Sequence, residues 1–151
     1  KDLYQENILF HGPSFQGVKE ILEITPDGLT IKCNLEGFSS IETGQFPADQ
    51  FNPFLADVHL QSILIWASDQ LQSTGLPLKI ARGTQYKTPP AEEDTYATME
   101  IKSRSNHKIV ADVISYDQDG YVYTEVEGAE ITLNDTLFEL FQENEIRAEK
   151  A

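Results

Sequence analysis

Asp57 and Gln61 stand out because they are polar residues in a mostly apolar stretch, residues 54–66. Residues four apart share one face of a helix, so the Gln61 amide can reach the Asp57 carboxyl group. A buried carboxyl group must be hydrogen-bonded, paired or neutralised, and burial favours its protonated form. Asp57 is therefore a candidate general acid, with Gln61 as the residue that orients it. The alternative is a partly exposed aspartate that interacts weakly with the helix dipole.

A second candidate segment surrounds a histidine near the start of the chain. Residues 9–17 read Leu-Phe-His-Gly-Pro-Ser-Phe-Gln-Gly, in which Gly12 and Pro13 predict a tight, irregular turn. Phe15 is placed to pack against the rest of the protein. His11 is either a polar residue that faces a ligand or a structural or solvated histidine beside a turn.

The other reactive side chains suggest no second chemistry. His59 is expected on the helix face opposite Asp57, and Cys33 lies in an apolar strand pattern typical of a core residue. The His, Cys, Asp and Glu residues show no metal-ligand spacing, and no glycine-rich phosphate loop occurs. We therefore expect neither a metal nor a bound cofactor.

One helix should carry Asp57 and Gln61. Asn52 and Pro53 are typical of a helix start, while Gly75 and Pro77 predict its end, which gives a helix of roughly twenty residues. Its first half is apolar nearly all round, as expected of a buried helix.

The rest of the chain predicts strands. Alternating apolar residues and turn signals place them at residues 15–24, 29–35, 78–86, 96–102, 108–116 and 121–133. Residues 117–120, Asp-Gln-Asp-Gly, form the clearest hairpin turn. Residues 136–141 have helical character. We expect an α+β domain in which an antiparallel sheet wraps around one long central helix.

Three short motifs, in order, resemble the C-terminal hotdog half of polyketide synthase dehydratases. Residues 12–17 resemble its Gly-Pro-x-Phe motif, residues 57–61 its Asp-x-x-x-Gln/His motif, and residues 76–80 (Leu-Pro-Leu-Lys-Ile) its Leu-Pro-Phe-x-Trp motif. The Asp119-Gly120 turn is similar to the closing hairpin of the family. The family usually has another aromatic residue at the position of His11. A histidine there, after Leu9 and Phe10, is closer to the polyunsaturated-fatty-acid-type and enediyne-type enzymes.

The resemblance implies a hotdog fold and removal of water from a 3-hydroxyacyl thioester, a lyase reaction. The substrate would be carried on the phosphopantetheine of an acyl carrier protein. Asp57 would be the catalytic acid and Gln61 its orienting residue. The predicted substrate-binding residues are His11, Gly12, Pro13 and Phe15.

The catalytic histidine of the family is missing from this sequence. That residue lies in the N-terminal hotdog half, in the motif His-x-x-x-Gly-x-x-x-x-Pro. None of His11, His59 and His107 has a glycine four residues later. We therefore expect a partner, the N-terminal half that carries the histidine, and an inactive protein without it.

Composition bounds the setting and the partners. The net charge of −14 argues against nucleic acid or an anionic membrane as a partner. No apolar run is long enough for a membrane span or a signal peptide, and one cysteine allows no internal disulfide, so a cytoplasmic location is expected. We expect residues 1–151 to form a single hotdog domain excised from a larger multidomain synthase, since the chain opens at Lys1. Basic residues concentrated between Lys79 and Lys108 are either a docking face for an acidic carrier protein or solvated strand faces.

Two other classes of function fit the same residues. One is a catalytically silent hotdog that binds an acyl chain or acts as a scaffold in a megasynthase. The other is a related hotdog enzyme: an isomerase, a product-template cyclase or a thioesterase. In either case a lone hotdog leaves a sheet edge uncovered, so the isolated chain is also expected to be able to form a homodimer.

Overall fold

The structure of the protein is a computed structural model, which describes residues 2–6, 8–36, 50–137, 139–140 and 143. One long helix and six strands account for most of these residues. In chain order they are a short 3-10 helix η1 (Pro13–Phe15), β1 (Val18–Thr25), β2 (Gly28–Cys33), α1 (Pro53–Leu71), β3 (Thr74–Gln85), β4 (Thr95–Arg104), β5 (Lys108–Tyr116) and β6 (Val122–Asn134).

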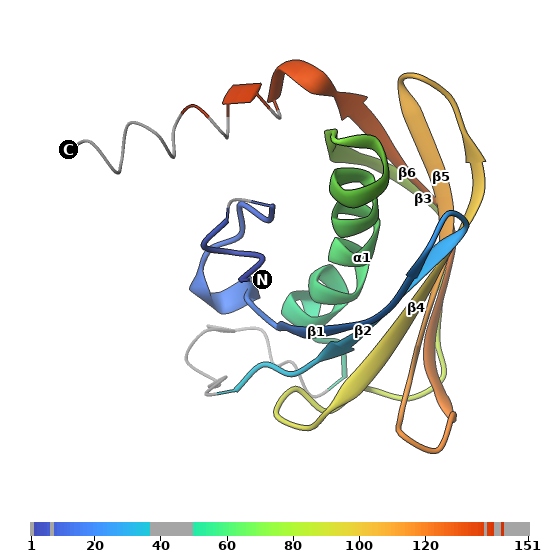
Figure 1. Ribbon diagram of the computed structural model, residues 1–151. Coiled ribbons are helices and arrows are strands. Elements are labelled where there is room, and N and C mark those ends of the chain that lie inside the picture. The colour runs from blue at the N-terminus through green and yellow to red at the C-terminus, as the bar shows by residue number, and fades with distance from the viewer. Residues whose placement is uncertain (1, 7, 37–49, 138, 141–142, 144–151) are drawn as a thin grey trace.

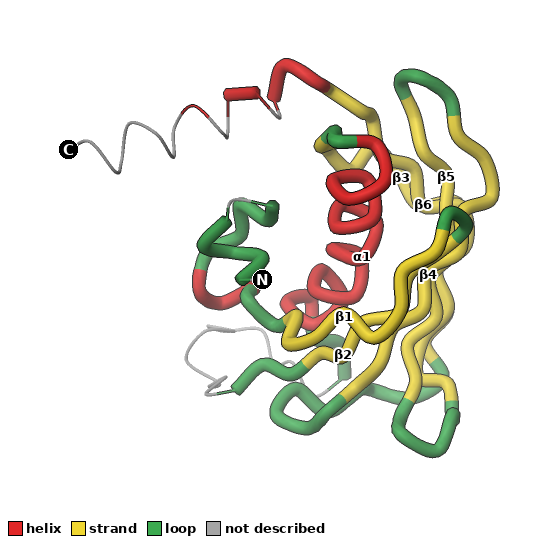
Figure 2. Tube along the Cα trace, viewed as in Figure 1, coloured by secondary structure: helices red, strands yellow, loops and turns green. Residues whose placement is uncertain are grey.

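The strands form a single antiparallel sheet in the order β1-β2-β4-β5-β6-β3. The sheet curves around α1, which lies inside its concave face (Figure 1). Figure 2 shows the same arrangement, with the single long helix enclosed by strands on one side and by the N-terminal loop on the other. The predicted α+β layout, a sheet wrapped around one central helix, is confirmed.

Helix α1 begins where the sequence predicts. The Asn52 side chain caps it, because its Oδ1 atom accepts hydrogen bonds from the backbone N–H groups of Phe54 (3.0 Å) and Leu55 (3.1 Å). Pro53 occupies the first turn, where its missing N–H group costs nothing. The helix buries apolar side chains on nearly every side, as predicted for its first half: Leu55, Val58, Ile63, Leu64, Ile65, Trp66 and Ala67.

The helix ends earlier and differently than predicted. Gln72, in a left-handed conformation (φ 46°), terminates α1, and Gly75 and Pro77 already belong to β3. Gly75 is needed there because a Cβ atom would collide with the backbone oxygen of Thr132 on β6. Pro77 is tolerated because β3 is an edge strand, and the pairing register shifts directly after it.

The first strand also starts later than predicted. Phe15 lies in η1 rather than in a strand, and β1 begins at Val18. Between them, Gly17 passes so close to α1 that a Cβ atom would be 2.8 Å from Val58 Cγ2. The β5–β6 hairpin is as predicted, with Gly120 at a positive φ of 88° and Asp117 accepting from two backbone N–H groups of the turn.

The basic residues between Lys79 and Lys108 mostly form ion pairs with neighbouring strands. Lys79 and Lys108 both pair with Glu130, at 3.0 and 3.1 Å. Lys102 lies 3.7 Å from Asp112 on β5 and 3.1 Å from Glu100 on its own strand. Arg82 pairs with Glu127 at 3.6 Å. This region is therefore a mixed-charge strand surface rather than a uniformly cationic one.

Residues 135–137 and 139–140 are helical, and the remainder of the helical segment predicted at residues 136–141 falls outside the described residues. In the described part of the chain, every helix is too short or too polar to cross a membrane.

Candidate functional site

Asp57 and Gln61 are brought together as the helical spacing predicts. The Gln61 side-chain amide donates a hydrogen bond from Nε2 to Asp57 Oδ2 (3.0 Å) and another to the Phe15 backbone oxygen (2.9 Å). Gln61 is buried, whereas the Asp57 side chain is 37% exposed and can meet a ligand. Asp57 is thus held in place from one side and remains accessible.

Tyr4 fixes the orientation of the Gln61 amide. Its hydroxyl group donates to Gln61 Oε1 (2.8 Å) and accepts from the Val18 backbone N–H (2.9 Å). Burial raises the pKa of Tyr4, so the hydroxyl keeps its proton and remains a donor. With Oε1 committed to Tyr4, the Gln61 amide must present N–H groups to Asp57. No local sequence pattern links Tyr4 to α1, so its contact with Gln61 could not be predicted from the sequence.

His11 lies directly beside Asp57, with its Nε2 atom 3.4 Å from Asp57 Oδ2. Its ring stacks on Phe10 at a centroid distance of 4.6 Å, and only 12% of the side chain is exposed. Burial lowers the pKa of His11, and the negative charge of Asp57 opposes that shift. The sequence left the position of His11 open, and the structure places it next to the carboxyl group.

The segment that carries His11 is held against α1 by several contacts. Within it the backbone N–H of Phe15 donates to Gly12 O (2.9 Å), and Pro13 begins the 3-10 turn that aims Phe15 O at Gln61. The Phe15 ring packs on Phe54 of α1, with centroids 4.8 Å apart. Gly12 and Phe15 therefore line the pocket beside Asp57, whereas Pro13 does not line it and instead shapes the turn between them. Their role in substrate binding stays a prediction.

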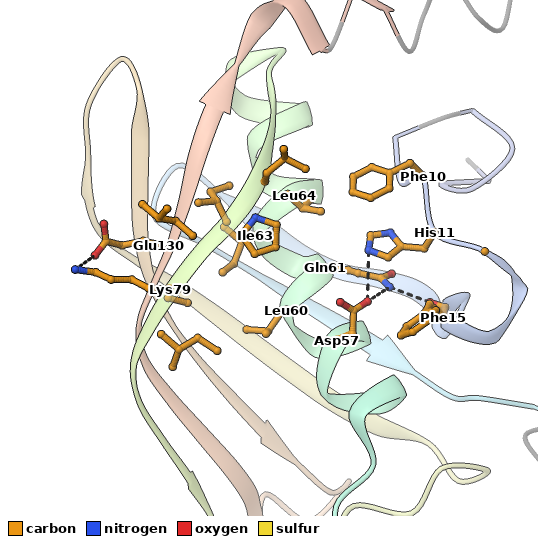
Figure 3. Close-up of a pocket in the computed structure, with 17 residues that line it drawn as sticks. Phe10, His11, Phe15, Asp57, Leu60, Gln61, Ile63, Leu64, Lys79 and Glu130 are labelled. Carbon is orange, nitrogen blue, oxygen red and sulfur yellow. Dashed lines mark hydrogen bonds and ion pairs between the residues drawn. The ribbon is translucent and has the colours of Figure 1, made fainter. Parts of the chain in front are cut away.

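These residues form the polar end of a pocket of about 610 Å³ between α1, β3, β6 and the N-terminal loop. Figure 3 shows His11, Asp57 and Gln61 pointing toward one another at this end. The rest of the lining is largely apolar: Phe10, Leu60, Ile63, Leu64, Leu76, Pro77, Leu78, Ile80, Ala129 and Ile131. Leu60 and Leu64 lie on the same face of α1 as Asp57 and line the pocket, whereas Ile65 is buried in the core.

The pocket is open along the edge strand β3. Three apolar side chains of this strand remain about half exposed: Leu76 (49%), Leu78 (60%) and Ile80 (48%). They come from the third motif noted in the sequence and line the pocket. An unpaired edge and an exposed apolar row are what a second hotdog would cover.

The remaining reactive side chains lie elsewhere. His59 is buried, with Nε2 3.1 Å from Thr95 Oγ1, and burial lowers its pKa to about 4. Cys33 is buried as well, as expected of a core residue. Within the described residues, no group of three His, Cys, Asp or Glu side chains is arranged to hold a metal ion.

Comparison with known proteins identifies the family. The family model described as "Polyketide synthase dehydratase N-terminal domain" matches residues 2–134. The chain belongs to this dehydratase family. It is also 26% identical, over 139 residues, to a polyunsaturated fatty acid synthase from Thraustochytrium sp. (strain ATCC 26185 / S-3). That match covers 90% of the chain but 5% of the synthase polypeptide.

Solved dehydratase structures confirm the hotdog fold. The dehydratase domain from the CurJ module of curacin polyketide synthase superposes with a TM-score of 0.71 at 20% identity, covering 89% of this chain and 49% of that one. The dehydratase domain of a mycocerosic acid synthase-like polyketide synthase gives a TM-score of 0.66 at 24% identity, covering 81% and 42%. The chain thus spans at most about half of these solved dehydratases.

The matching family model is described as the N-terminal domain of the dehydratase. The motifs at residues 12–17, 57–61 and 76–80 resemble the C-terminal half instead. Both observations place the chain in the dehydratase family. They differ on which of the two hotdog halves it is.

Proposed function

We propose that this chain is the aspartate-bearing half of a dehydratase that removes water from 3-hydroxyacyl thioesters on an acyl carrier protein. Asp57 is the acid, and Gln61 orients it. The supporting observation is the accessible Asp57 carboxyl group, hydrogen-bonded by Gln61, at the polar end of an apolar pocket. An apolar pocket of this kind can hold an acyl chain, with the hydroxyl group of the substrate near the polar side chains at one end.

The proposed reaction needs one base and one acid. A base on the complementary hotdog half removes the α-proton, and the electrons of that C–H bond form the new double bond. The C–O bond at the β-carbon breaks, and the departing oxygen takes a proton from Asp57. The products are an enoyl thioester and water, and the proton held by the base returns through solvent to the Asp57 carboxylate.

The shape of the pocket supports the need for a second half. Its wall along β3 is open, and Leu76, Leu78 and Ile80 are exposed there. The solved dehydratase domains are about twice the length of this chain, which agrees with a missing complementary half. Because this sequence lacks the His-x-x-x-Gly-x-x-x-x-Pro motif, the base would come from that half.

The test is dehydration by the complete protein, with the complementary half present and a 3-hydroxyacyl thioester on its carrier protein. Asp57→Asn should abolish formation of the enoyl product while leaving the thermal unfolding temperature nearly unchanged. Asp69→Asn is the matched control, since Asp69 is an exposed aspartate on the same helix. Undiminished turnover by Asp57→Asn would exclude Asp57 as the acid.

The same assay separates the alternative functions by their products. A double bond that has moved indicates an isomerase, a ring a cyclase, and a free acid a thioesterase. Binding of the acyl thioester with no product at all would favour the silent acyl-binding hotdog.

A further inference from the structure

His11 is not part of the family's His-x-x-x-Gly-x-x-x-x-Pro motif, yet its imidazole contacts the Asp57 carboxyl group. His11 Nε2 contacts Asp57 Oδ2, the second imidazole nitrogen is buried, and the two carboxyl oxygens of Asp57 have different surroundings.

The second nitrogen decides where the imidazole carries its proton. His11 Nδ1 is buried and makes no hydrogen bond within the described part of the chain. A proton on Nδ1 would be a buried donor without an acceptor, which costs more than an unused acceptor lone pair. The proton therefore belongs on Nε2, which faces Asp57 Oδ2 at 3.4 Å.

The same orphaned nitrogen disfavours the imidazolium, because the charged form carries a proton on both nitrogens. The lowered pKa of His11, caused first by burial, points in the same direction. The resting state is then a neutral imidazole whose Nε2–H group is directed at the Asp57 carboxyl group. The separation is slightly longer than an ordinary hydrogen bond, as is common at catalytic groups before substrate binds.

The carboxyl group is approached unevenly. Asp57 Oδ2 accepts a hydrogen bond from Gln61 Nε2 at 3.0 Å and lies 3.4 Å from His11 Nε2. Among the described residues no hydrogen bond reaches Oδ1. An oxygen that faces two N–H groups is the better place for negative charge, so the transferable proton is directed to the other oxygen.

We propose that His11 is a positioning residue for the dehydration: its neutral imidazole, protonated on Nε2, donates to Asp57 Oδ2 and directs the reactive proton to Oδ1. When Oδ1 releases its proton to the departing hydroxyl group, His11 and Gln61 stabilise the carboxylate that forms. This inference rests on the proposed function for its catalytic part, but the state of His11 can be measured without turnover.

The other ionisable side chains near the pocket have little influence on the charge of His11 and Asp57. Lys79 on β3 and Glu130 on β6 also line the pocket, but they pair with each other at 3.0 Å. Tyr4 reaches Asp57 only through Gln61, and its raised pKa keeps it neutral. The titration of His11 should therefore respond mainly to Asp57.

Nitrogen NMR of this chain, labelled in its histidines, tests the resting state directly. The His11 imidazole should be the neutral Nε2–H tautomer at pH 7. In Asp57→Ala the tautomer preference should weaken and the pKa of His11 should fall further, because the charge that raises it is gone. A neutral Nδ1–H tautomer, an imidazolium at pH 7, or a pKa that does not respond to Asp57→Ala would overturn the proposal.

Kinetics of the complete protein separate positioning from simple packing. His11→Phe keeps an aromatic ring to stack on Phe10 but removes the donor, and it should lower kcat roughly tenfold or more with little change in KM. His11→Gln restores an N–H donor and should recover part of the loss. The opposite order, with His11→Phe active and His11→Gln impaired, would mean that His11 only packs.

The two measurements distinguish failure of this inference from failure of the proposed function. If Asp57→Asn keeps full turnover, the dehydratase assignment of Asp57 fails whatever the state of His11. If Asp57→Asn is inactive but the NMR result or the order of the His11 variants is wrong, only the role of His11 fails.

Discussion

Buried His59 should make the stability of the protein decrease on mild acidification. Its side chain lies in the core against Thr95, and burial lowers its pKa to about 4 from an ordinary value of 6.5. The unfolded chain therefore binds a proton below pH 6.5, whereas the folded protein does not until about pH 4. The contribution of neutral His59 to the free energy of unfolding is fully present above pH 6.5 and is lost as the pH falls toward 4.

The size of the effect follows from the two pKa values. At pH 5 the unfolded chain holds nearly one proton more than the folded one at this residue, and the linkage relation gives a loss of about 2 kcal/mol between pH 8 and pH 5. This is a large part of the free energy of unfolding of an ordinary domain.

Urea unfolding at pH 8, 7, 6 and 5, followed by the fluorescence of the single tryptophan, Trp66, measures this directly. Because carboxyl groups also titrate, the wild type is compared with His59→Gln, whose side chain can still hydrogen-bond Thr95 but does not titrate. The stability difference between the two proteins should change by about 2 kcal/mol from pH 8 to pH 5. His107→Gln is the control, since His107 is exposed. Parallel curves for wild type and His59→Gln would refute the reasoning.

Three further predictions concern the elements that position the site. Asn52→Ala should cost about 1 kcal/mol of stability in thermal unfolding, because it removes the cap of α1, and Asn52→Asp should restore most of it. Gly75→Ala should lower the unfolding free energy by roughly 1–3 kcal/mol in urea, since the added methyl group meets the backbone of Thr132; an unchanged value would mean that β3 can shift. Trp66→Phe should lower the unfolding free energy by roughly 1–3 kcal/mol, measured by circular dichroism, because the partly buried Thr25 carbonyl loses the indole N–H at 2.9 Å; no loss would mean that another donor replaces it.

Much of the fold could be predicted from the sequence because its signals are local. The start of α1 depends on Asn52 and Pro53, whose capping and backbone preferences act within one turn. The β5–β6 hairpin depends on Asp117 and Gly120, which act within the turn itself. Asp57 and Gln61 meet because they are one helical turn apart.

The errors lie where distant segments meet. Gly75 and Pro77 have the local character of a helix stop, but the close approach of β6 and the edge position of β3 make them strand residues. Phe15 has the character of a strand residue, yet its backbone is drawn into a 3-10 turn whose carbonyl group binds Gln61.

The buried helix, the antiparallel strands and the pairing of Asp57 with Gln61 can be inferred from local sequence patterns, since capping, periodicity and turn chemistry operate over a few residues. Two contacts have no such local signal and become visible in the three-dimensional arrangement: Tyr4 orients Gln61, and His11 lies against Asp57. Those contacts exist because the N-terminal segment folds across the open side of α1, and its position there depends on packing between parts of the chain that are far apart in sequence.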